Sequence, residues 1–143
     1  MRQTRLLVVA TLFLTFIASG WMANAANSQE GHAKHGFSIK QYEDFHEVLH
    51  PLQHEALPNK DFKVIRAKSA LLTKRGQAIV RLGVPRGTSK ENRAQFVSEL
   101  KKFSKALTKY RADARRGTDL QLEASYSAVH DSFEMLVAML PRS

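Results

Sequence analysis

Hydrophobic residues recur at steps of three and four along four consecutive stretches of the chain. This spacing is typical of one face of an α-helix, and no stretch alternates with a period of two, so we predict helices and no strands. The stretches run from Ser38 to Pro58, Asn59 to Gly83, Thr88 to Gly117 and Thr118 to Pro141. Because the links are short, we predict an all-α fold, an antiparallel up-down-up-down four-helix bundle over residues 38–141.

The recurring positions are also the predicted core. They are Tyr42, Phe45, Leu49, Leu52 and Ala56; Phe62, Ile65, Ser69, Leu72, Gly76 and Ile79; Phe96, Leu100, Phe103, Leu107, Tyr110 and Ala114; and Leu122, Tyr126, Val129, Phe133, Leu136 and Leu140. Small residues at Ser69 and Gly76 should allow a neighbouring helix to approach the second helix closely.

Polar residues and glycines predict where the helices begin and end. Three pairs have the spacing of a capping box, and Asn59 is the expected cap of the second helix. The pairs are Ser38 with Gln41, Thr88 with Glu91, and Thr118 with Gln121. Gly83 and Gly117 should follow the second and third helices. Pro51 lies inside the first helix and predicts a kink between Glu47 and Pro51.

Residues 1–25 have the pattern of a secretory signal peptide. Arg2 and Arg5 precede an apolar run, and Ala23-Asn24-Ala25 is a small-residue cleavage site. We therefore expect an exported, periplasmic protein that is soluble after cleavage and has a flexible leader over residues 26–37. An uncleaved N-terminal anchor is the alternative.

The chain has a formal net charge of +9 and no cysteine. Without thiols it has no disulfide, thiolate metal site or thioether-linked haem. In an exported protein the positive charge, much of it on the third helix, favours a solvated face, an acidic protein partner or an anionic membrane surface over nucleic acid. We predict no enzyme, since nucleophile elbow, H-E-x-x-H motif and phosphate-binding glycine loop are all absent from the sequence.

Histidines supply the candidate chemistry. His46, His50 and His54 follow one another at four-residue spacing, which stacks side chains along one helix. In an antiparallel bundle the first and last helices are neighbours, and their register places His46 and His50 near His130. We predict that these three imidazoles hold a transition-metal ion, Cu, Zn or Ni, because imidazole suits these metals.

Three further residues complete the candidate metal site. Glu134 follows His130 by one turn, Met135 offers a thioether, and His54 could form a second, more exposed site with His50. His54 taken alone is more simply a surface residue.

The last predicted helix, with Tyr126, Val129 and His130, resembles the haem-binding helix of the c-prime-type four-helix cytochromes. Those proteins carry a C-x-x-C-H motif there, and Tyr126 and Val129 stand in the places of the cysteines. The resemblance therefore implies no covalent haem. Non-covalent haem between His130 and the first helix, as in the b-type relatives, is the alternative that it leaves.

The chain also resembles periplasmic metal-binding bundles of the nickel/cobalt-resistance sensor type. Their first helix carries H-x-x-x-H followed by a proline, matched here by His46, His50 and Pro58. Their last helix has a histidine followed by Phe-Glu-Met, matched by His130 with Phe133-Glu134-Met135. The carboxylate that those proteins take from their second helix has no match between Lys63 and Lys74. The resemblance implies a role in metal buffering, resistance or sensing.

Two other functions compete with metal binding. One is a non-metal adaptor or chaperone-like bundle that engages a partner through its basic third helix. The other is a b-type haem carrier. The pattern leaves the oligomeric state open.

Overall fold

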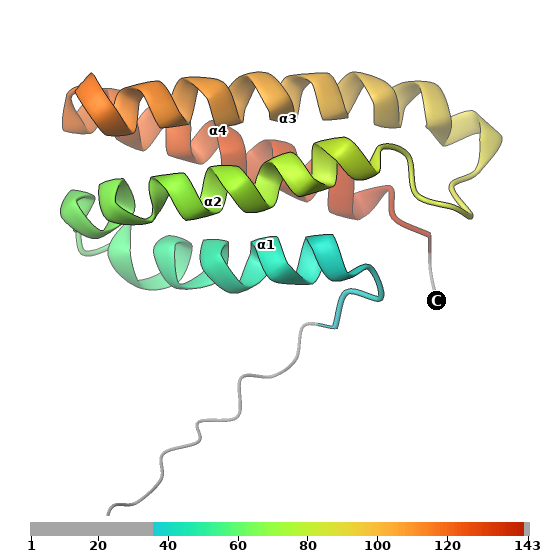
Figure 1. Cartoon of the computed structure of the whole chain (residues 1–143), viewed down its shortest axis with the longest axis horizontal. Helices are drawn as coiled ribbons and strands as arrows, with labels where there is room; N and C mark the ends of the chain where they lie inside the picture. The colour runs from blue at the N-terminus through green and yellow to red at the C-terminus, as the bar shows by residue number, and fades with distance from the viewer. Residues whose placement is uncertain (1–35, 142–143) are drawn as a thin grey trace, which may run out of the picture. The chain divides into compact units, whose positions relative to one another are not determined.

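The computed structural model describes residues 36–141, which form four α-helices and no strand (Figure 1). The helices are α1 (Lys40–Pro51), α2 (Phe62–Leu82), α3 (Lys90–Arg116) and α4 (Asp119–Ala138), and a π-helical turn, η1 (Leu52–Ala56), follows α1 directly. The chain reverses direction at each connection, so consecutive helices run antiparallel (Figure 1). The all-α prediction is confirmed. The expected signal peptide and nearly all of the leader lie outside the described residues.

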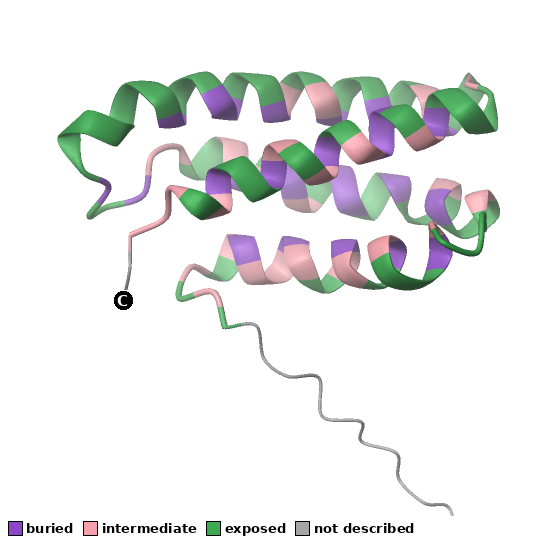
Figure 2. Ribbon diagram, turned by 180° about the vertical axis from the view of Figure 1, so that it is seen from behind, coloured by how far each residue is buried: buried purple, intermediate pink, exposed green. Residues whose placement is uncertain are grey.

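The predicted hydrophobic stripes line the inside of the helices (Figure 2). Every position of the four stripes is buried except Phe62 and Leu140, which are half-buried. A Cβ atom on Gly76 would lie only 2.6 Å from Leu107 Cδ1 in α3 and 3.1 Å from Phe45 Cε2 in α1. Glycine at this position therefore permits the close approach of helices that the sequence predicts.

Aromatic rings join α1 to α4. The Phe133 ring of α4 lies 4.7 Å from the Phe45 ring and 5.9 Å from the Tyr42 ring, measured between centroids. It also lies 6.4 Å from the Phe103 ring of α3. Such pairs stabilise packing beyond the area that they bury, so Phe133 connects three helices at one point.

The capping box of α4 forms as predicted. The Gln121 N–H donates to Thr118 Oγ1 at 3.2 Å, and the Thr118 N–H donates to Gln121 Oε1 at 2.9 Å. Gly83 follows α2 with a positive φ of 72°, a backbone conformation that glycine adopts without strain. Gly117 follows α3, as expected.

The other three predicted N-caps are wrong. Helix α1 follows Ile39 without a side-chain cap, and the Phe37 N–H donates instead to Glu43 Oε2 at 3.0 Å. Asp61 caps α2, since its Oδ1 accepts from the Val64 N–H at 3.1 Å, and the Asn59 side chain donates instead to the Glu55 carbonyl. Ser89 caps α3, because the Thr88 hydroxyl donates to the Pro85 carbonyl inside the preceding turn. In the last two cases the expected capping group has a closer local partner.

Pro51 produces a change of helix type. Proline has no N–H, so the carbonyl four residues before it loses its helical donor. Beyond Pro51 the chain forms the π turn η1, after which the Leu57 N–H donates to the Leu52 carbonyl five residues back, at 2.9 Å. The Leu49 carbonyl accepts from the Tyr126 hydroxyl of α4 at 3.2 Å. Helix α1 continues through the stretch from Glu47 to Pro51 where we predict a kink, and the irregularity that follows Pro51 is the widened turn η1.

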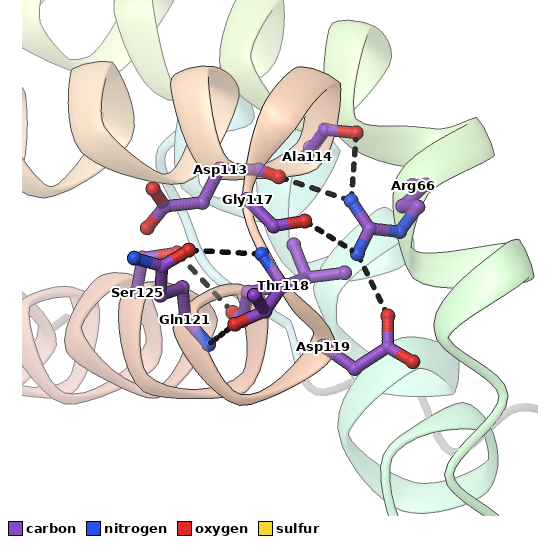
Figure 3. A network of polar contacts seen from close by, with 9 residues as sticks. Arg66, Asp113, Ala114, Gly117, Thr118, Asp119, Gln121 and Ser125 are labelled. Atoms are coloured by element: carbon purple, nitrogen blue, oxygen red, sulfur yellow. Dashed lines mark hydrogen bonds and ion pairs between the residues drawn. The ribbon is translucent and has the colours of Figure 1, made fainter.

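Arg66 of α2 bonds to the connection between α3 and α4 (Figure 3). Its guanidinium donates to the carbonyls of Asp113 and Ala114 at 3.0 and 3.2 Å and to that of Gly117 at 3.0 Å. It also pairs with Asp119 Oδ1 at 2.7 Å. The last carbonyls of a helix have no partners within that helix, and a cation near them is favourable. One side chain therefore satisfies the end of α3 and pairs with the first turn of α4.

We expect Arg66→Ala to lower the free energy of unfolding by about 2 kcal/mol, because hydrogen bonds to a charged group each contribute more than neutral ones and these are only partly exposed. Urea denaturation followed by circular dichroism measures the change. Arg81→Ala, at an exposed position of the same helix, is the matched control and should stay close to the wild type. Equal losses in the two variants would contradict the assigned role of Arg66.

Candidate functional site

Three histidine rings lie in succession along α1 and η1. The ring centroids of His46 and His50 are 5.3 Å apart, and those of His50 and His54 are 4.4 Å apart. His46 and His50 are half-buried, and His54 is exposed. We call these three side chains the histidine ladder.

The π turn accounts for the close approach of His54 to His50. Four residues overshoot one turn of an α-helix, so side chains at this spacing drift steadily around a straight helix. The turn closed by a five-residue hydrogen bond is wider, so four residues advance through a smaller angle. His54 lies in η1 and therefore stays over His50.

The inner end of the ladder packs on aromatic rings. The His46 ring lies nearly parallel to the Phe133 ring of α4, with an interplanar angle of 22° and centroids 6.4 Å apart. It also meets the Phe37 ring edge-on at 5.4 Å. The predicted register, which sets His46 level with residues 129 to 133 of α4, is confirmed at Phe133.

His130 lies half-buried on α4, and its Nδ1 is 3.3 Å from the carboxylate of Asp131. When Nδ1 carries the proton, it donates to Asp131 and leaves the lone pair of Nε2 for a metal ion. A carboxylate in contact with the second ring nitrogen is common at histidines that bind metals. Glu134 is exposed, and Met135 is 45% exposed.

Asp44 lies two residues before His46 and forms ion pairs with two cations. It contacts Lys40 Nζ at 2.6 Å and Arg75 of α2 at 2.8 Å. The hydrogen bond from Lys40, followed by the charges of Lys40 and Arg75, holds the pKa of this carboxyl below its usual value. Asp44 therefore joins α1 to α2.

A groove of about 370 Å³ runs beside the ladder, between α1–η1 and α2. Its apolar lining includes Pro51 and Leu52, and carboxylates stand along it at Glu47, Glu55 and Asp61. Glu47 and Glu55 each follow a histidine of the ladder directly. The packing of α2 against α1 and η1 makes Glu47 and Glu55 walls of the groove and adds Asp61.

Formal charge is divided between two pairs of helices. Helices α1 and α4 with η1 carry eight Asp or Glu and one Lys, and we call them the acidic helices. Helices α2 and α3 carry fifteen Lys or Arg and three Asp or Glu, and we call them the basic helices. All histidines between residues 36 and 141 lie on the acidic helices.

The structure brings some of the predicted metal ligands together and leaves others apart. His46 and His54 each contact His50, whereas His130 contacts its own neighbour Asp131. Within residues 36–141, no three His, Asp or Glu side chains lie close enough to hold one ion between them. The convergence of His46, His50 and His130 on one metal ion stays a prediction.

None of the helices between residues 36 and 141 combines the length and the apolar character needed to cross a membrane. The chain matches no protein-family model, no curated protein and no solved structure.

Proposed function

We propose that this protein binds a transition-metal ion, Cu, Zn or Ni, through the imidazoles of the histidine ladder, in metal buffering, resistance or sensing. The observation that carries the proposal is the pair of ring contacts at 5.3 and 4.4 Å along α1 and η1. Imidazole is a ligand that all three metals accept. His54 is exposed and His50 is half-buried, so both lie where an ion from solvent can reach them.

The charge of the acidic helices supports cation binding. Their formal balance is −7, with eight acids and one lysine, in a chain whose total is +9. Three of these acids, Asp44, Asp119 and Glu123, pair with Lys or Arg, and the other five are in no described ion pair with Lys or Arg. A surface of one sign raises the local concentration of ions of the opposite sign. A metal cation is thus attracted to the helices that carry the histidines, and Glu47 and Glu55 lie next to the ladder.

His130 can extend the site across the seam between α1 and α4. The contact of His130 with Asp131 is of the kind that orients a metal-binding imidazole. Phe133, one turn further along α4, touches the His46 ring. Glu134 and Met135 are exposed on the same helix and supply an oxygen and a thioether donor.

The proposed place of action is outside the cytoplasm, most simply the periplasm. The proposal rests on the signal-peptide pattern of residues 1–25. Mass spectrometry of the protein recovered from a periplasmic extract tests it, because cleavage after Ala25 yields a chain that begins at Ala26.

Titration calorimetry with Cu²⁺, Zn²⁺ and Ni²⁺ separately tests the metal site. We expect one of these ions to bind, and we expect His50→Ala with His54→Ala to weaken it at least a hundredfold, since removal of a mere supporting group already costs 10- to 100-fold. Binding should also fall below about pH 6.5, because imidazole must lose its proton to bind metal. His32 and His35 are unchanged in this variant, so a loss of metal affinity is due to the ladder histidines.

Two further variants set the limits of the site. Gln53→Ala, between the two histidines, is the matched control and should bind as the wild type does. His130→Ala weakens binding only when α4 contributes a ligand, which separates a site on α1–η1 from one shared with α4. Unchanged affinity in the variant lacking His50 and His54 would contradict the proposal.

A further inference from the structure

The basic helices present far more positive charge than the molecule neutralises. Four of the fifteen cations form ion pairs: Lys102 with Glu99 at 2.8 Å and Lys109 with Asp113 at 2.7 Å on α3, and Arg66 and Arg75 of α2 with Asp119 and Asp44 of the acidic helices. The formal balance of these two helices is +12, from fifteen cations and three acids. The cations extend over helices of 21 and 27 residues, which at 1.5 Å per residue is roughly 30 to 40 Å. The charge therefore covers an extended surface.

An apolar slot of about 400 Å³ lies on the same surface, along the seam between α2 and α3. Val80, Val97 and Leu100 line it, and Lys101 and Lys105 stand at its rim. Val97 is 42% exposed. An apolar strip bordered by lysines is the arrangement by which a protein lies on a lipid surface, with apolar groups at the acyl boundary and ammonium groups at the phosphates.

We infer that the α2–α3 seam binds the surface of a bilayer that contains anionic phospholipids. Charge complementarity selects an anionic partner, and the length of the basic surface matches a continuous plane of phosphates better than a compact ion. The slot adds an apolar contact that a purely ionic partner would leave unused. The acidic helices would be repelled by the same bilayer, so the histidine ladder would face away from the membrane.

The inference is independent of metal binding because it uses none of the histidines. Co-sedimentation of the purified protein with vesicles tests it, once with phosphatidylglycerol mixed into phosphatidylcholine and once with phosphatidylcholine alone. We expect binding only to the anionic vesicles and a steep loss on addition of salt, which screens surface charge. All variants share the N-terminus of the wild type, so differences between them report on the helices.

A variant with Lys101→Gln, Lys105→Gln and Arg111→Gln removes three exposed cations that no described ion pair uses. Its affinity for anionic vesicles should fall on the order of a hundredfold, because each cation near such a surface contributes several-fold. The matched control carries Ala124→Glu, Ala128→Glu and Ala138→Glu at exposed positions of α4. It lowers the net charge by the same three units on an acidic helix and should bind nearly as the wild type does.

Three outcomes would overturn the inference. The two triple variants could lose affinity equally, which would mean that only total charge matters. The wild type could bind pure phosphatidylcholine equally well. Anionic vesicles could fail to bind while soluble polyglutamate binds the seam, in which case the partner is an acidic protein. Circular dichroism of each variant establishes that it is folded.

Discussion

Phe133→Ala is expected to lower the free energy of unfolding by about 3–5 kcal/mol, the range for removing a fully buried phenylalanine from a core. Phe133 is 0% exposed, and its ring contacts five others. The five are Phe37, Tyr42, Phe45, His46 and Phe103. Alanine leaves a cavity where α1, α3 and α4 meet, and these rings cannot all move to fill it.

Thermal and urea unfolding measure this loss, and the melting temperature should drop by more than about 10 °C for a domain of this size. Met135→Ala, two residues further along α4 at a 45% exposed position, is the matched control and should change stability by less than about 0.5 kcal/mol. A loss below about 1 kcal/mol in Phe133→Ala would show that α1 and α4 do not depend on this ring.

Unfolding above pH 10 is expected to be steep, because three tyrosines are completely buried. Burial raises the pKa of Tyr42, Tyr110 and Tyr126 well above the usual value, and Tyr110 raises that of Tyr126 further. The stability contributed by a group with a raised pKa is fully present below its unfolded pKa, near 10, and is lost as the pH rises above that value. With three protons involved, the free energy of unfolding should fall by about 4 kcal/mol per pH unit.

Tyr42→Phe isolates one of the three protons. The slope above pH 10 should become shallower by about a third, while the stability at neutral pH should not fall. The Tyr42 hydroxyl has no hydrogen-bond partner among residues 36–141, whereas Tyr110 donates to the Ile65 carbonyl at 2.8 Å. Urea denaturation at a series of pH values, together with tyrosinate absorbance, measures both quantities. Identical slopes in the wild type and the variant would show that Tyr42 ionises without unfolding the chain.

The helix boundaries show how much of the structure a local sequence pattern can predict. The capping box of Thr118 forms with both of its expected hydrogen bonds. Thr88 and Asn59 have equally suitable side chains, but the Pro85 and Glu55 carbonyls lie within their reach. The choice between a cap and a competing turn depends on the path of the chain before the helix, which a spacing rule does not contain.

The candidate site likewise has features that the sequence predicts and features that depend on tertiary packing. The four-residue spacing of His46, His50 and His54 predicts neighbouring rings, and the structure confirms that these rings meet. The closeness of His54 to His50 depends on the π turn beyond Pro51. The Tyr126 hydroxyl of α4 donates to the Leu49 carbonyl in the last turn of α1, just before that π turn. The groove with Glu47, Glu55 and Asp61 likewise exists only because α2 packs beside α1.

The amino-acid sequence by itself determined four helices, their order and nearly every core position, because the burial of one helical face follows directly from a repeat of three and four residues. Tertiary structure decided which particular side chains meet across helices, such as the Arg66 guanidinium at the end of α3 and the Phe133 ring beside Phe45 and Phe103. These contacts join residues that are distant along the chain, so they depend on how the helices pack, and a local repeat carries no information about that.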